Sequence, residues 1–305
     1  MKRAAIGVDI GGESVKLGLV DERGRLLERE TFLTRGLTRM ALIDVLSAHV
    51  GDLASRAGGR RLKLLGVGIG APGPIDVERG FVTFFPNIPG WKNTPLKSIL
   101  DRRLRMPVRL DNDANVMALA ESAFGAAKGA GNVIALTLGT GVGGGLLIGG
   151  RLYHGHRFSA AEIGHMPVSE DGPVCGCGSR GCIETFIGSG YFMRALPPKL
   201  RLSARTPLDV ERAARAGNRE ARQAWETAGR RLGGFLAGLA NLLNPEVIVI
   251  GGGIARSGAL LFGPLRRALR KNAFPIAARS VRVVPAKLGV DAGITGAAAL
   301  LFFPQ

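Results

Sequence analysis

Three cysteines and one histidine lie close together near the middle of the chain. Cys175, Cys177 and Cys182 are the only cysteines of the sequence, and His165 precedes them. Three thiolates and one imidazole form a complete tetrahedral donor set for Zn²⁺, and the glycines between the cysteines allow the tight wrapping that such a site needs. Because the protein fills all four positions, none is left for water, and we expect a structural zinc site. An odd number of clustered cysteines also favours a reducing compartment over a disulfide framework.

A carboxylate stands between a predicted strand and a predicted helix. Asp113 follows the strand at residues 108–111, precedes the helix at residues 116–124, and is flanked by Asn112 and Asn115. At the carboxyl end of a strand such a carboxylate can accept a proton from a hydroxyl group while neighbouring amides orient that hydroxyl. The same residue types also cap helix N-termini. These residues alone leave both interpretations open, a general base and a helix cap.

Three glycine-rich turns each follow an apolar stretch directly. They are Gly11-Gly12, Gly139-Thr140-Gly141-Val142-Gly143-Gly144-Gly145 and Gly251-Gly252-Gly253. Because glycine has no Cβ, backbone N–H groups in such turns can approach an oxyanion closely. The spacing matches neither the Rossmann fingerprint nor the Walker motif. The three turns together therefore predict a phosphate-binding cleft in which a nucleotide lies between hairpins.

Alternating strands and helices must position these residues. The expected strands are residues 4–9, 15–20, 26–32, 64–69, 108–111, 133–138, 146–148 and 247–250, and the expected helical segments are residues 37–57, 116–124, 208–231, 264–271 and 289–301. The strand, glycine turn and strand of the N-terminus recur after residue 132, which indicates an internal duplication. We therefore expect an α/β fold of two lobes with a cleft between them. The expected lobes are residues 1–112, completed by a C-terminal helix at 290–305, and residues 113–289, which carry the zinc loop and most nucleotide contacts.

Charge and hydropathy exclude several classes of protein. The 305 residues include 41 Lys and Arg against 24 Asp and Glu, a net charge of +17. Most of the surplus falls after residue 190, spaced through predicted helices as on solvated helix faces, with a polyanion-binding face as the alternative. The length excludes a disordered tail protein, and no stretch is long and apolar enough to span a membrane. The N-terminus does not resemble a secretory signal, so we expect a cytoplasmic protein.

Five motifs resemble those of the ROK family (repressors, open reading frames, kinases). They are Asp9-Ile10-Gly11-Gly12, Asn112-Asp113-Ala114-Asn115, Leu138-Gly139-Thr140-Gly141-Val142-Gly143-Gly144-Gly145, Glu162-Ile163-Gly164-His165 and Cys175-Gly176-Cys177-Gly178-Ser179-Arg180-Gly181-Cys182-Ile183-Glu184. The resemblance covers nearly the whole chain. It implies an actin-like, ribonuclease-H-like two-lobed ATPase fold and phosphorylation of a hexose by ATP with Mg²⁺.

The resemblance also implies roles for single residues. Asp113 would be the catalytic base, and His165 would hold a sugar hydroxyl while also ligating zinc. The sugar-binding residues implied are Gly73, Asn87, Asn112, Asp113, Glu162, His165 and Glu184. The nucleotide-binding residues expected at the three glycine turns are Asp9, Gly11, Gly12, Ser14, Lys16, Gly139, Thr140, Gly141, Gly143, Gly251, Gly252 and Gly253.

One residue departs from the family pattern. Glu13 stands where the family usually has threonine. A carboxylate there repels phosphate unless it points away or meets Mg²⁺, so we expect the hydroxyl contact to pass to Ser14.

The sequence also starts at its first strand, without room for the winged helix-turn-helix of ROK repressors. We therefore expect neither a DNA-binding repressor nor a nucleic-acid partner, and we expect a homodimer or higher homo-oligomer, as is common among similar proteins.

The expected activity is that of a glucokinase of glycolysis, with ATP as phosphoryl donor and the 6-hydroxyl of glucose as acceptor. Two enzymatic alternatives stay open: an N-acetylmannosamine kinase, favoured by the segments Ala160-Ala161-Glu162 and Asp171-Gly172-Pro173, and a glucokinase that uses polyphosphate. A sugar-sensing or polyanion-binding protein without turnover is the alternative outside the enzymes. The net charge and Glu13 are the features that motivate it.

Overall fold

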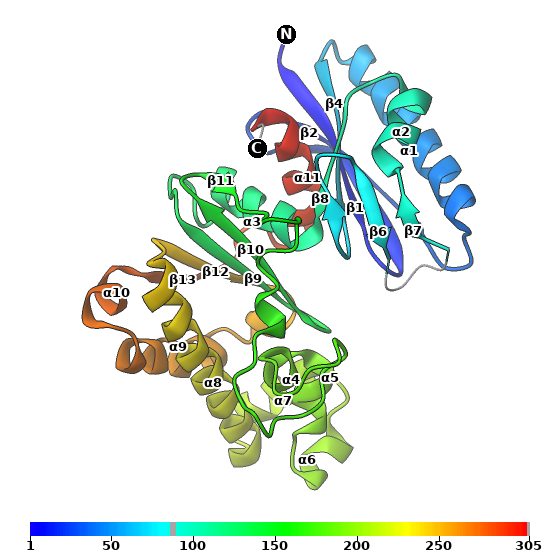
Figure 1. Ribbon diagram of the computed structural model, residues 1–305. Coiled ribbons are helices and arrows are strands. Elements are labelled where there is room, and N and C mark those ends of the chain that lie inside the picture. Colours follow the sequence, from blue (N-terminus) through cyan, green and yellow to red (C-terminus); the bar gives the residue numbers. More distant parts are fainter. Residues whose placement is uncertain (86–89, 304–305) are drawn as a thin grey trace. The chain divides into compact units, whose positions relative to one another are not determined.

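The computed structural model describes residues 1–85 and 90–303 and has the α/β fold expected from the sequence (Figure 1). The chain divides into two compact units, which are described separately below. Unit 1 comprises Met1–Gly129, Leu146–Ala160 and the chain from Lys287 onward, and unit 2 comprises Ala130–Gly145 and Ala161–Ala286. The lobes expected from the sequence, with a division after residue 112, stay a prediction. The compact units differ from them in placing residues 113–129 with the N-terminal sheet.

A five-stranded sheet with the order β3-β2-β1-β4-β8 forms the centre of unit 1. Its strands are β1 (Arg3–Ile10), β2 (Ser14–Asp21), β3 (Leu26–Leu33), β4 (Lys63–Ala71) and β8 (Val108–Asn112). The first three strands are antiparallel, and β4 and β8 continue the sheet in parallel with β1. The pairing places Asp9 opposite Gly70 and Gly70 opposite Asp111. The carboxyl ends of these three parallel strands therefore present two predicted site segments at one edge of the sheet.

The helices of unit 1 cover this sheet with their apolar faces. They are α1 (Arg39–Gly59), α2 (Leu96–Leu104), α3 (Asp113–Ala123) and α11 (Ala292–Phe302). Helix α11 packs on β1 and β4 at very short range, because a Cβ at Gly7 or Gly68 would collide with the carbonyl oxygen of Ile294 or Ala297. A small sheet of β5 (Ile75–Asp76), β6 (Phe81–Phe84) and β7 (Lys92–Thr94) completes the unit.

A second five-stranded sheet repeats the plan of the first, with the order β11-β10-β9-β12-β13. Its strands are β9 (Val133–Leu138), β10 (Val142–Ile148), β11 (Arg151–Leu152), β12 (Val247–Gly251) and β13 (Arg282–Pro285). Strand β12 runs parallel to both of its neighbours, as β4 does in the first sheet. This common plan agrees with the internal duplication indicated by the sequence. The expected strand at 146–148 was too short, since β10 already begins at Val142.

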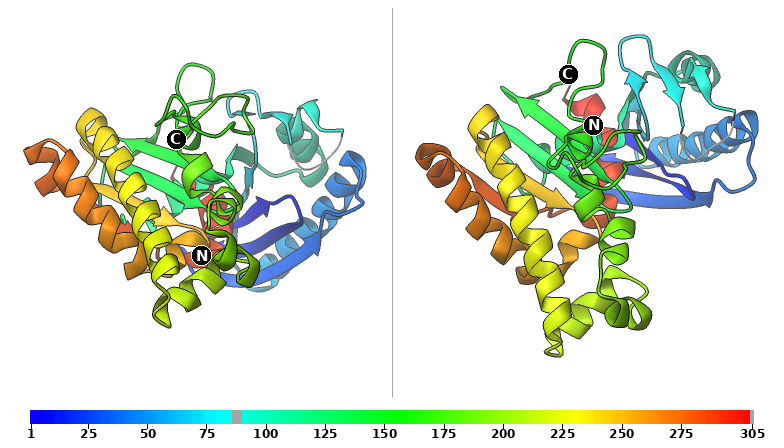
Figure 2. Two further views of the ribbon diagram at one scale, coloured as in Figure 1. Left: turned by 90° about the horizontal axis from the view of Figure 1, so that it is seen from below. Right: turned by 60° about the horizontal axis from the view of Figure 1, so that its bottom comes forward.

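Two long helices lie side by side along unit 2, α8 (Arg219–Leu243) and α9 (Ala259–Asn272) (Figure 2). Their backbones approach closely, because a Cβ at Gly229 or Gly233 would collide with a carbonyl oxygen of α9. The other helices of this unit are α4 (Glu184–Ile187), α5 (Ser189–Arg194), α6 (Pro198–Ser203), α7 (Pro207–Arg215), α10 (Pro275–Ser280) and the short 3₁₀ helices Ile163–His165 and Ile254–Ser257. The 3₁₀ helix Gly289–Asp291 belongs to unit 1. The single helical segment expected at 208–231 is thus two helices, since the chain turns at Gly217 with φ +98°.

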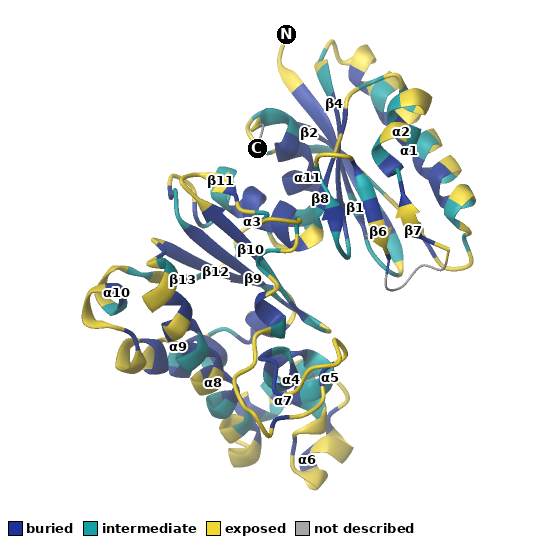
Figure 3. Cartoon of the chain, in the orientation of Figure 1, coloured by how far each residue is buried: buried dark blue, intermediate teal, exposed yellow. Residues whose placement is uncertain are grey.

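The burial pattern follows the layers within each unit (Figure 3). The central strands are buried along most of their length, whereas the outer faces of α1, α8 and α9 are exposed. Many of the arginines of the last third lie on such exposed helix faces, in agreement with the solvated-surface interpretation of the charge. Among the described helices, none combines the length and the hydropathy that a bilayer crossing requires.

Candidate active site and metal centre

The turn from β8 into α3 carries the candidate catalytic carboxylate. Asn112 is the N-cap of α3: its side-chain oxygen accepts hydrogen bonds from the backbone N–H groups of Ala114 (2.9 Å) and Asn115 (3.4 Å). The capping role that the sequence left open for Asp113 therefore falls to its neighbour. Asp113 is the first residue of the helix and is exposed, and its carboxylate also accepts the N–H of Ala114 at 2.8 Å.

A buried carboxylate supports this turn from behind. One oxygen of Asp111 accepts hydrogen bonds from the backbone N–H of Asn112 (2.7 Å) and the side-chain amide of Asn115 (2.8 Å). The other oxygen lies 2.7 Å from Nε2 of His154. Burial lowers the pKa of His154, but the hydrogen bond and the charge of Asp111 raise that pKa by more, so it lies above its ordinary value. The partly buried imidazole and the buried carboxylate thus form a pair next to the Asn112-Asp113 turn.

The same turn is also hydrogen-bonded to the loop that contains Gly73. The side-chain amide of Asn112 donates a hydrogen bond to the carbonyl oxygen of Gly73 at 3.2 Å. Gly73 has φ +85°, a left-handed conformation that favours glycine. Three of the residues expected at the sugar, Gly73, Asn112 and Asp113, therefore lie together within unit 1. Asn87, which was also expected there, lies outside the described residues.

The first glycine turn joins β1 to β2 in unit 1. The N–H of Gly11 donates to the carbonyl oxygen of Ser14 at 2.9 Å and closes the turn. Asp9 precedes the turn and Lys16 follows it, opposite each other in the strand pair. Burial raises the pKa of Asp9, and the charge of Lys16 offsets this in part. Glu13, the departure from the family pattern, is exposed, and the expected transfer of the hydroxyl contact to Ser14 stays a prediction.

The second and third glycine turns line one cavity of about 510 Å³ in unit 2. Gly139, Thr140 and Gly253 contribute to its wall. Three other residues expected at the nucleotide have different surroundings: Gly143 belongs to strand β10, Gly251 ends strand β12, and a Cβ at Gly252 would collide with the backbone of Leu138. The turn at residues 139–145 is thus shorter than expected, since glycines carry no side chain that would reveal a strand.

Further residues line this cavity that the sequence did not single out. They are Ser189, Thr206, Pro207, Leu208, Glu211, Trp225, Ile254, Arg256 and Ser257. Trp225 is buried, and its indole nitrogen has no hydrogen-bond partner among the described residues. Thr206 is the N-cap of α7, in a capping box with Asp209. The sequence analysis predicted neither this cap nor its position beside the glycine turns.

The cysteines and the histidine of unit 2 form a compact cluster, as their spacing predicted. The ligand atoms of His165, Cys175, Cys177 and Cys182 all lie within 4.8 Å of one another. Sγ of Cys177 and Sγ of Cys182 are 3.7 Å apart, and Sγ of Cys175 lies 3.6 Å from Nδ1 of His165. Tetrahedral ligands at Zn–S distances of roughly 2.3 Å are separated by about 3.8 Å. The donor set and its dimensions therefore fit a zinc ion.

The pKa values of the three thiols differ with their surroundings. Burial raises the pKa of Cys175 to about 12 and also raises the pKa of Cys182, whereas a hydrogen bond from the backbone of Ser179 lowers the pKa of Cys177. A bound dication deprotonates coordinating thiols outright. Backbone hydrogen bonds also order the loop: Val168 N–H donates to Gly181, Cys175 N–H to Ser179 and Gly181 N–H to Pro173. A metal would add four bonds to this backbone framework.

Glu184 connects the cysteine loop to the second glycine turn. Its Oε2 accepts the N–H of Val142 at 2.8 Å, and the thiol of Cys175 lies 3.7 Å from its Oε1. A Cβ at Gly141 would collide with this carboxylate, so a larger residue there would displace the side chain of Glu184. Glu162 is exposed at the N-terminus of the 3₁₀ helix that ends at His165. Unit 2 therefore carries the other three residues expected at the sugar.

Comparison with known proteins agrees with the motifs found in the sequence. The ROK family model matches residues 5–302. The chain is 39% identical to a glucokinase of Thermotoga maritima, with 98% of both chains covered. It is similar to the crystal structure of a ROK hexokinase from Thermus thermophilus, with a TM-score of 0.83 and 33% identity over 98% of this chain and 97% of that chain.

A second solved structure contains ligands. It is a ROK family glucokinase from Streptomyces griseus in complex with glucose and AMPPNP, with a TM-score of 0.79 and 36% identity over 97% of this chain and 98% of that chain. The predicted actin-like two-lobed fold is the fold of these sugar kinases and is confirmed. The motifs, the fold and the extent of the match lead to one conclusion: this chain belongs to the ROK family.

Proposed function

We propose that this chain is an ATP-dependent glucokinase, which transfers the γ-phosphoryl group of ATP to the 6-hydroxyl of glucose. The observation that carries the proposal is the exposed carboxylate of Asp113 on a turn that is capped by Asn112 and supported by Asp111. The similarity to glucokinases over the full length of the chain supports glucose as the acceptor.

Asp113 acts as the general base. Its carboxylate accepts the proton of the 6-hydroxyl while the sugar oxygen forms a bond to the γ-phosphorus and the bond from that phosphorus to the bridging oxygen of ADP breaks. Asn112 orients the acceptor, because its side chain is fixed between the helix N-terminus and the carbonyl of Gly73. Holding the acceptor in place is a large part of what a protein contributes to phosphoryl transfer.

The glycine turns receive the nucleotide. In unit 1 these are Gly11 and Gly12 with Asp9, Ser14 and Lys16, and in unit 2 Gly139, Thr140 and Gly141 with the cavity beside them. Gly143, Gly251, Gly252 and Gly253 complete the predicted nucleotide set. Mg²⁺ bound to ATP would neutralise the charge on the phosphates, and Asp9 is the carboxylate of the first turn that suits it.

The sugar is held by Gly73, Asn87, Asn112, Glu162, His165 and Glu184. In this proposal the zinc ion is structural: with four protein ligands it has no open position, and it fixes the loop that carries Glu184. The reduced thiols and the use of ATP fit a cytoplasmic enzyme of carbohydrate metabolism.

Measurement of kcat/KM over a panel of hexoses and N-acetylhexosamines, each with Mg·ATP and with polyphosphate, tests this proposal. We expect the highest value for glucose with ATP, by at least about tenfold, which corresponds to about 1.4 kcal/mol of transition-state discrimination. A higher value for N-acetylmannosamine than for glucose would show that the chain is an N-acetylmannosamine kinase. Faster turnover with polyphosphate than with ATP would show that polyphosphate is the phosphoryl donor. Absence of turnover with every pair, from protein that contains zinc, would contradict the proposal.

A further inference from the structure

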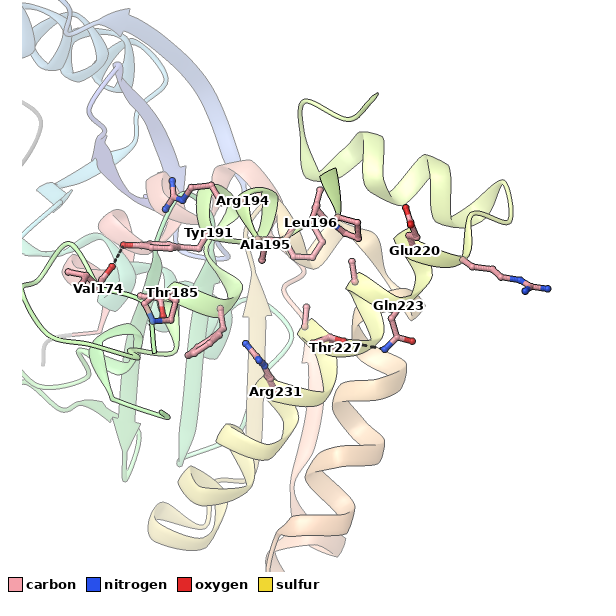
Figure 4. A pocket seen from close by; sticks show the side chains of 17 residues that line it. Val174, Thr185, Tyr191, Arg194, Ala195, Leu196, Glu220, Gln223, Thr227 and Arg231 are labelled. Carbon is pink, nitrogen blue, oxygen red and sulfur yellow. Dashed lines mark hydrogen bonds between the residues drawn. The ribbon is translucent and has the colours of Figure 1, made fainter. Parts of the chain in front are cut away.

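A cavity of about 1020 Å³ lies in unit 2 and shares no lining residue with the cavity at the glycine turns. Its walls come from three segments: the start of the cysteine loop at Pro173 and Val174, the helices α4 and α5, and the first half of α8 (Figure 4). Its volume is that of cavities which hold small organic ligands. None of the roles proposed above uses this cavity.

The lining is largely apolar but carries guanidinium groups. Phe192 and Leu196 form buried parts of the wall, and Val174, which also lines the cavity, is 54% exposed. Three arginines line the cavity against one acidic residue, Glu220. A large apolar surface with a few charged groups is typical of sites that bind amphipathic ligands.

The arginines are positioned but not neutralised. The guanidinium group of Arg194 stacks at 4.3 Å over the ring of Tyr191, and that of Arg231 stacks at 4.3 Å over the ring of Phe186. Within residues 1–85 and 90–303, neither of these arginines nor Arg219 forms an ion pair with a carboxylate. A guanidinium that stacks through its face keeps its N–H donors at the edge, where they can bind an anion in bidentate fashion.

We propose that this cavity binds a small amphipathic anion, with an aromatic or aliphatic body and one carboxylate, sulfonate or phosphate group. The apolar body lies against Phe192, Leu196 and the aromatic rings, and the anionic group meets one of the two guanidinium groups, that of Arg194 or that of Arg231, which Figure 4 draws apart from each other. A neutral ligand leaves both guanidinium groups without a counter-charge, and a strongly hydrophilic polyanion leaves the apolar wall uncovered.

The site is connected to the segment between Val174 and Thr185, which carries the three cysteines and Glu184. Both ends of this segment line the cavity, and the hydroxyl of Tyr191 donates to the carbonyl oxygen of Val174 at 3.1 Å. Thr185 directly follows Glu184, whose carboxylate accepts the N–H of Val142. An occupied cavity therefore changes the KM for glucose. This consequence rests on the proposed function, whereas binding itself does not.

The first test is fluorescence titration of the intact, zinc-loaded protein with 8-anilinonaphthalene-1-sulfonate, an aromatic monoanion. Saturating glucose and AMPPNP are present, so that the dye does not occupy the nucleotide cavity. We expect one saturable site per chain. Arg194→Gln combined with Arg231→Gln raises the dissociation constant of the dye at least about tenfold, which equals about 1.4 kcal/mol.

Two further variants make the titration decisive. Ala224→Trp fills the cavity from α8 and abolishes dye binding. Arg270→Gln combined with Lys271→Gln also removes two positive charges, on an exposed part of α9, and leaves binding as in the native protein. Native kcat and melting temperature establish that the variants fold. Absence of saturable binding to the native protein overturns the proposal, as does equal binding by native and Ala224→Trp protein. If a second copy of the chain covers the cavity, dye binding per chain decreases as the protein concentration rises. That result would also overturn the proposal.

The second test measures KM for glucose with and without the dye at saturating ATP. We expect a change of roughly fivefold or more in the native enzyme and none in Ala224→Trp, because coupling between sites is commonly of this size. Dye binding without turnover of any sugar refutes the proposed function and leaves the site standing. Turnover without dye binding refutes the site and leaves the proposed function standing.

Discussion

The Asn112-Asp113 turn and the cysteine loop are both predicted site segments, but they are held in place in different ways. Asp111 accepts hydrogen bonds from two partners behind the turn and pairs with His154, and Asn112 caps the helix that follows. The loop from His165 to Cys182 has backbone hydrogen bonds of its own, and burial disfavours the thiolates of Cys175 and Cys182 in its cluster. The first segment is held by hydrogen bonds to a buried carboxylate, whereas in the second a metal would join the four predicted ligand residues.

This difference distinguishes the catalytic role of the turn from the substrate-positioning role of the loop. A catalytic group gains most when its surroundings do not rearrange during the reaction, and the hydrogen bonds that a buried carboxylate accepts from the turn provide that. A loop that carries ligands for the substrate needs only to be held in position, which a closed metal site achieves with few residues. We therefore expect variants in the turn to change kcat and variants in the loop to change metal content, stability and KM.

The largest effect on turnover is expected for Asp113→Asn. Removal of the base should lower kcat by roughly 10²- to 10⁴-fold, with KM for glucose, zinc content and melting temperature unchanged. Steady-state kinetics with metal analysis of the same preparation measures this. Asp52→Asn on the exposed face of α1 is the matched control and should retain native turnover. Loss of zinc from Asp113→Asn would show that the two segments are not independent.

The largest effect on stability is expected for Cys175→Ser. This variant should lose the metal and lower the melting temperature by roughly 5–10 °C, because loss of a metal is among the costliest changes and each kcal/mol shifts the midpoint of a large domain by about 2–4 °C. KM for glucose should rise, since Glu184 lies beside this thiol. Calorimetry and metal analysis provide the readouts. A zinc-free variant with native melting temperature and KM would contradict the structural role.

Asp111→Asn should produce an intermediate effect. The amide cannot accept both hydrogen bonds and also pair with protonated His154, so the cost is about 3 kcal/mol of unfolding free energy, as for a broken buried pair. We expect kcat to fall about tenfold while zinc stays bound, because the carboxylate of Asp113 loses its fixed position. Denaturant unfolding and kinetics measure the two parts. Full loss of zinc together with kcat would indicate general unfolding instead.

The smallest effect is expected for His154→Gln, and it should depend on pH. Since the pKa of His154 in the folded protein lies above its ordinary value of 6.5, the pair with Asp111 contributes its full stability below that value and loses it as the pH rises through the folded pKa. The variant should therefore be less stable than the native protein by roughly 1–2 kcal/mol in acid, with a smaller difference in alkali. Denaturant midpoints measured from pH 5.5 to 8.5 test this sign. A difference that grows with pH would contradict it.

The parts of the site that the sequence predicted are local. His165 and the three cysteines lie within the 18 residues from His165 to Cys182, so their spacing and the glycines between them were enough to predict that they meet. The carboxylate turn was likewise visible as a strand followed by Asn112 and Asp113. What remained open was which residue caps the helix, because Asn and Asp serve equally well.

The parts that the sequence did not predict depend on distant contacts. His154 and Asp111 are 43 positions apart, and no periodicity shows that they pair. The same holds for Trp225 and Thr206 beside the second and third glycine turns. Strand β10 begins earlier than expected because its first residues are mostly glycines, which carry no pattern of apolar side chains. Fold class and motifs were predictable, whereas the supporting contacts required the structure.

The most direct test of the account is product analysis. Native zinc-loaded protein, incubated with glucose and Mg·ATP, should form glucose 6-phosphate and ADP in equal amounts, and Asp113→Asn with a full complement of zinc should form neither above roughly one hundredth of the native rate. Formation of the sugar phosphate by Asp113→Asn at the native rate, or of ADP without any sugar phosphate by the native protein, would contradict the assignment of this turn as the catalytic centre of a glucokinase.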